Sequence, residues 1–154
     1  MPHVDLTLSE LSDQHPARPG YGRAASAGSL NRWASVVELA AEPCLLLDVD
    51  GTAVSVSPAC RDIFGIDPQR AVGRPLVDGV LRLLDFNAVS GELPGWQVDK
   101  IPPLLAITSG GLARGLLRIP SPDGTPSTVD AIATPLRDRG MVVGSLTFFA
   151  LVGR

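Results

Sequence analysis

Two acidic residues separated by one position are the strongest chemical signal in the sequence. Asp48 and Asp50 follow the apolar run Leu45–Leu47 and precede Gly51-Thr52. A carboxylate at Asp48 could attack phosphorus, and Asp50 could act as general acid and base while magnesium neutralises the phosphate. Hydrolysis of a phosphate ester is therefore one hypothesis. The same letters equally fit a strand, a turn and a second strand that perform no chemistry.

The motif resembles the nucleophile segment of phosphatases of the haloacid dehalogenase class, but the rest of the chain departs from that pattern. Such an enzyme needs a cation beside the phosphate, and the only lysine, Lys100, precedes the candidate phosphate-binding residue Thr108 instead of following it. The class also needs a parallel sheet with long crossovers, whereas the last predicted strands are joined by short turns. We therefore predict that the protein is not an enzyme and that Asp48 makes only local hydrogen bonds.

An amphipathic helix is predicted over residues 30–42. Ser29 is suited to cap its first turn, and Pro43 ends it. An apolar stripe of this kind packs on the parent domain or pairs with a second copy of itself. We predict that this stripe is a dimer or partner interface, made of Leu30, Trp33, Val36, Val37 and Ala40.

A β-hairpin is predicted directly after this helix. Residues 44–49 are apolar, and residues 52–57 alternate between apolar and polar side chains, as a half-buried strand does. Asp50-Gly51 between them is typical of a two-residue turn in which both central residues have positive φ. Ser57-Pro58 then predicts the capped start of a helix that ends at Gly65.

The remaining elements complete an α+β pattern. Asp67-Pro68 predicts a short helix that ends near Gly73, residues 76–86 are helical or mixed, and a helix is predicted over 99–109. Three strands follow, at residues 112–119, 127–136 and 141–152. We expect one five-stranded antiparallel sheet with short helices on one face and the helix 30–42 flanking it.

The order and spacing of several motifs resemble the PAS domain family over about residues 30–152. The matching segments are Leu45–Ser57, Ser57–Ala59, Ile63–Gly65, Val72–Leu76, Asp123-Gly124, Thr134–Leu136 and Val143–Ser145. The resemblance implies a sensory or regulatory module of signal transduction. Because only five residues follow Phe149, we expect a stand-alone module that acts in trans through protein–protein contacts, as a homodimer and with an unidentified signalling protein.

One connection departs from the family pattern. The segment from Phe86 to Lys100 is longer than usual and carries Trp96. Phe86 and Trp96 either pack this long loop down or form a lid or partner-contact loop.

No cofactor is expected. PAS domains that bind haem usually supply a histidine, but the only histidines, His3 and His15, precede the predicted domain. Light-sensing relatives form a flavin adduct on a cysteine, and the nearest equivalent segment, Gly73–Leu76, contains none. Cys44 and Cys60 are expected to be buried free thiols. An unidentified apolar ligand in the core, which would make the protein a receptor for a small hydrophobic molecule, is the alternative.

Composition limits the remaining classes. The net charge of −3 and the pI of about 5.2 give no electrostatic case for nucleic acid or an anionic membrane. No apolar run approaches the roughly 20 residues of a membrane span, and no signal peptide is visible. Residues 1–29, rich in Pro, Gly, Ser and Ala, are predicted to be a flexible tail, and residues 30–152 a single domain. We expect a cytoplasmic protein.

Overall fold

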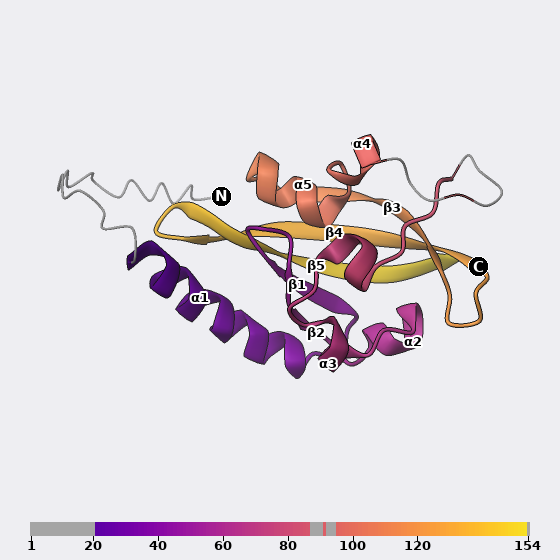
Figure 1. Cartoon of the computed structure of the whole chain (residues 1–154), viewed down its shortest axis with the longest axis horizontal. Helices are drawn as coiled ribbons and strands as arrows, with labels where there is room; N and C mark the ends of the chain where they lie inside the picture. Colours follow the sequence, from indigo (N-terminus) through magenta and orange to yellow (C-terminus); the bar gives the residue numbers. More distant parts are fainter. Residues whose placement is uncertain (1–20, 87–90, 92–94, 154) are drawn as a thin grey trace, which may run out of the picture.

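A computed structural model describes residues 21–86, 91 and 95–153. Within these residues the strands form one five-stranded antiparallel sheet in the order β2-β1-β5-β4-β3 (Figure 1). The strands are β1 Cys44–Asp48, β2 Ala53–Val56, β3 Ala113–Pro120, β4 Pro126–Asp138 and β5 Met141–Gly153. The helical elements are α1 Tyr21–Glu38, α2 Cys60–Phe64, α3 Pro68–Ala71, the π-helical turn η1 Leu76–Val80, α4 Gly95–Val98 and α5 Pro102–Ser109. The predicted α+β fold is confirmed.

The two faces of the sheet are covered by different helices. Leu45 and Leu47 of β1 point into the larger core, which α2, α3, η1 and α5 cover; we call this face the inner face. Leu46, between them, points to the outer face, where α1 packs. Figure 1 shows α5 and α1 on opposite sides of the sheet. Among the described helices, none is long and apolar enough to cross a bilayer.

Helix α1 begins earlier than the sequence predicted. It starts at Tyr21, so Ser29 lies inside the helix and is not its cap. The physical reason is the run Arg23–Ala27, which contains three alanines, the strongest helix formers. The helix also ends at Glu38, four residues short of the prediction. Of the predicted tail over residues 1–29, residues 1–20 lie outside the described part of the chain.

The turn between β1 and β2 also differs from the prediction. Gly51 has φ of +78°, but Asp50 does not have positive φ. The amide of Gly51 donates to the carbonyl of Asp48 at 3.1 Å, and the amide of Asp48 donates to the carbonyl of Thr52 at 3.0 Å. These bonds close a three-residue loop, in which a single residue has left-handed backbone. A turn with two positive φ values does occur between β4 and β5, at Arg139 (51°) and Gly140 (79°).

Ser57 joins two strands and does not cap a helix. Helix α2 begins after Ala59, and no side chain caps it. The Ser57 hydroxyl instead accepts a hydrogen bond from the amide of Cys44 at 2.9 Å and donates one to the carbonyl of Glu42 at 2.7 Å. The end of β2 is thereby held to the start of β1.

The other predicted helix ends are close to those observed. Gly65 and Gly110 end α2 and α5 with φ of +67° and +68°. Asp67 caps α3 by accepting a hydrogen bond from the amide of Gln69 at 3.0 Å. Helix α5 begins at Pro102 and not at Asp99, because two consecutive prolines suit the first turn of a helix but not its interior.

Candidate functional site

The two carboxylates that suggested a phosphatase have a structural role. Asp48 Oδ1 accepts hydrogen bonds from the amides of Asp50 at 2.9 Å and Thr52 at 3.0 Å, as an aspartate in a turn commonly does. Asp50 is exposed. All strand pairs of the described sheet are antiparallel, which is not the sheet that a dehalogenase-like nucleophile requires. The predicted local hydrogen bonding of Asp48 is confirmed, and the phosphatase hypothesis has no support.

The predicted interface residues on α1 divide into two groups. Leu30 and Val37 are buried against the outer face of the sheet, where they pack with Leu46 and its neighbours, and Ala40 is half-buried beside them. Trp33 and Val36 are exposed, at 38% and 58% of their surface. Only these last two can meet a partner while α1 stays on the sheet.

A second set of exposed apolar side chains lies on the outer face beyond α1. Ile132 of β4 and Phe148 of β5 are directly paired and are 37% and 44% exposed. Leu116 of β3, 54% exposed, lies on the same face one strand away. We call Leu116, Ile132 and Phe148 the outer patch. The sequence did not reveal it, because an outward apolar residue in a strand has the same letters as an inward one.

An ion pair borders the outer patch. Arg114 of β3 donates to both carboxylate oxygens of Asp130 on β4, with a shortest distance of 2.6 Å. These hydrogen bonds lower the pKa of Asp130 and raise the pKa of Arg114. Arg114 is also the direct strand partner of Ile132, so the patch has a charged margin.

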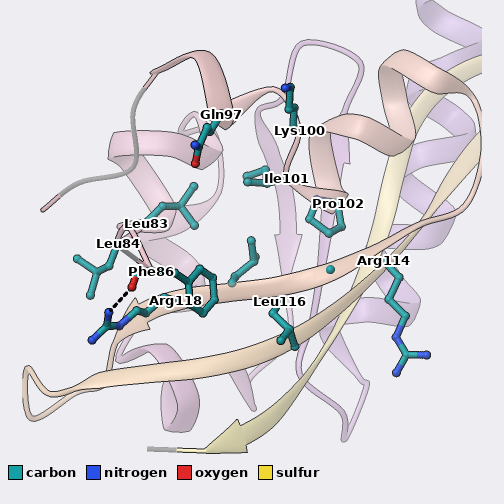
Figure 2. A pocket seen from close by; sticks show the side chains of 12 residues that line it. Leu83, Leu84, Phe86, Gln97, Lys100, Ile101, Pro102, Arg114, Leu116 and Arg118 are labelled. Carbon is teal, nitrogen blue, oxygen red and sulfur yellow. Dashed lines mark hydrogen bonds between the residues drawn. The ribbon is translucent and has the colours of Figure 1, made fainter. Parts of the chain in front are cut away.

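A groove of about 320 Å³ lies along the free edge of β3 (Figure 2). Three segments line it: residues 83–86, residues 97–102 and residues 114–118. Phe86 is 49% exposed in this lining, and the Nη1 atom of Arg118 donates to its carbonyl at 3.5 Å. Trp96 lies in α4, in a segment that was expected to be loop, and its side chain is outside the described part of the structure. Sequence reasoning found Phe86 but not the groove, which depends on how three distant segments meet.

The two cysteines are buried free thiols, as predicted. Cys44 packs in the core under α1, and Cys60 packs in the inner core. Burial raises the pKa of Cys60 to about 11, and it also raises the pKa of Cys44. Both groups are therefore protonated at neutral pH and are poor nucleophiles. Since segment 73–76 contains no thiol, these residues do not fit a cysteinyl-flavin adduct.

Comparison with known proteins gives a consistent result. A sequence model described as PAS fold matches residues 31–82. No curated protein matches the sequence.

Solved structures of similar fold include the PAS domain of a Colwellia psychrerythraea protein, with 17% identity and a TM-score of 0.57 over 81% of this chain and 98% of that chain. The Rhodobacter sphaeroides LOV protein has 17% identity and a TM-score of 0.63, over 82% of this chain and 69% of that chain. The PAS domain of Bordetella pertussis BvgS has 12% identity and a TM-score of 0.54, over 82% and 87%. At these identities the likeness concerns the fold alone.

Proposed function

Because this chain contains a PAS domain, a fold of sensory and signalling modules, we propose that it acts in trans by contacting other proteins, first of all a second copy of itself. The observation that carries the proposal is the outer patch. Its three large apolar side chains lie exposed on a sheet face, where water contact is costly and a partner would remove it. Trp33 and Val36 add exposed apolar surface on the helix that covers the same face.

The margin of the patch suits a symmetric pair. In a two-fold dimer each copy presents the same surface, so every group must meet a complement within that surface. Arg114 and Asp130 lie side by side next to Ile132, which lets the arginine of one copy face the aspartate of the other. An apolar centre bordered by both signs of charge is the arrangement of many protein interfaces.

The double substitution Ile132→Glu/Phe148→Lys is expected to make the protein monomeric. The two residues are direct strand partners, so the new opposite charges face each other and preserve the pairing of β4 with β5 while they remove the apolar centre. Size-exclusion chromatography with light scattering measures the change: the wild type should have twice the mass of the variant.

The matched control is Leu105→Glu on α5, which also replaces a partly exposed leucine, at 37%, by a charge. It lies on the helix that covers the inner face and should leave the mass unchanged. A double variant that keeps the dimeric mass, or a wild type that is already monomeric, would contradict the homodimer.

A receptor for a small hydrophobic molecule is the second candidate, favoured by the groove beside β3. Leu83, Ile101 and Leu117 give it an apolar lining of a size that a small ligand could occupy. Native mass spectrometry of the purified protein separates the two functions. We expect the mass of the polypeptide alone, whereas a stoichiometric additional mass would favour the receptor.

A further inference from the structure

Strand β3 is an edge of the sheet, and part of its outer side is open. Among the described residues, the only pairing on this side is a bridge in which the amide of Leu84 donates to the carbonyl of Arg118 at 2.8 Å. Backbone groups in an antiparallel strand alternate in direction every residue. The amides and carbonyls of Leu116 and Arg114 therefore point the same way as those of Arg118, toward the groove.

The groove has the properties of a slot for an added strand. Leu84 already occupies one position of that slot, beside the far end of β3. Phe86 and Leu116, both about half exposed, offer apolar contacts to alternate side chains of an incoming segment (Figure 2). An extended segment that binds in this way gains affinity from backbone hydrogen bonds and specificity from its side chains.

The charges of the edge select the occupant. The described lining of the groove contains Lys100, Arg114 and Arg118 and no acidic residue. If two β3 edges paired symmetrically about Leu116, Arg114 of one copy would face Arg118 of the other, which is unfavourable. The edge therefore disfavours pairing with itself and favours an acidic segment.

The sequence contains one segment with the required pattern upstream of α1. Val4, Leu6 and Leu8 alternate with polar residues, at the spacing of a strand, and Asp5 and Glu10 supply two acids. We propose that residues 4–10 bind along the outer edge of β3 as an additional strand.

The length of the chain permits this contact. Eleven residue steps separate residue 10 from Tyr21, and an extended chain covers about 3.3 Å per residue, so the segment can reach about 36 Å. Leu30 of α1 packs with Leu136 and Val143, near the β4–β5 turn. Arg137, next to Leu136, donates to the carbonyl of Gly110 at 2.7 Å, just before β3 begins. The first turns of α1 thus lie at the end of the sheet where β3 starts.

Amide hydrogen exchange in the full chain tests the proposal. In the wild type the amides of Arg114 and Leu116 should exchange at least about tenfold more slowly than in Leu6→Ser/Leu8→Ser, which removes the apolar side of the segment. Asp5→Lys/Glu10→Lys should lose the same protection, because it places cations beside cations. The amide of Leu146 in the central strand serves as a reference that no tail variant should change.

The control Gln14→Ser/Ala17→Ser alters the tail outside the segment and should retain the protection. Equal exchange at Arg114 and Leu116 in the wild type and in both test variants would overturn the proposal. Protection that increases with protein concentration would also overturn it, because the segment would then come from another copy. None of these variants changes Ile132 or Phe148, so a failure here leaves the homodimer test unaffected.

Discussion

Replacing Gly144 by alanine is expected to destabilise the domain by on the order of 4 kcal/mol, enough to unfold much of the protein. Gly144 lies in β5 opposite Asp48 of β1. A Cβ atom at this position would overlap the carbonyl oxygen of Leu47, and it would also press on a methyl group of Leu30 at 3.2 Å. The first contact is with the backbone of a paired strand, which cannot rotate away as a side chain can. Urea unfolding followed by circular dichroism measures the loss.

Gly153→Ala, near the end of the same strand, is the matched control. A Cβ atom there meets nothing within 4 Å, and the residue does not have positive φ, so the stability should change by less than about 0.5 kcal/mol. If Gly144→Ala unfolded at the same urea concentration as this control, β1 and β5 would not be as close as described.

The substitution Ser57→Ala is expected to lower the free energy of unfolding by roughly 2 kcal/mol. It removes the hydroxyl that accepts from the amide of Cys44 and donates to the carbonyl of Glu42. The amide of Cys44, a residue that is 1% exposed, would be left without this acceptor in a site that water does not reach. Thermal and urea unfolding of the variant measure the cost.

Ser55→Ala on the same strand gives the comparison. Ser55 is equally buried, but its hydroxyl makes one long bond, 3.3 Å to the carbonyl of Ala34, and accepts none from an amide. It should cost less than half as much. Equal losses in the two variants would mean that Ser57 contributes through packing and not through its two hydrogen bonds.

The sequence was most informative where local chemistry dictates structure. Gly65 and Gly110 end helices because left-handed backbone suits glycine, and Asp67-Pro68 begins one because a carboxylate cap and a fixed φ favour it. The alternation of β2 and the short turns between the last strands were sufficient to predict an antiparallel sheet.

Positions that depend on distant neighbours were less predictable. Ser57 precedes a proline and has the letters of a helix cap, yet its partners lie thirteen and fifteen residues earlier in the chain. Val37 and Val36 are adjacent and chemically identical, but one is 1% exposed and the other 58%, because the rotation of α1 on the sheet decides which is covered. The outer patch and the groove likewise require the strand order, which local patterns do not encode.

The strand order has a consequence for how the chain acquires its structure during synthesis. Strand β1 pairs with β2, nearby in the sequence, but its other edge pairs with β5, so that Leu46 lies opposite Leu146. Contacts between residues this far apart carry a large loop-closure entropy and slow the folding of a domain. While the chain emerges from the ribosome, the first hairpin has one edge unpaired until the last strand arrives. Its apolar residues, Leu45–Leu47, are then the segment most exposed to aggregation, and the nascent chain is the state in which a chaperone would bind them.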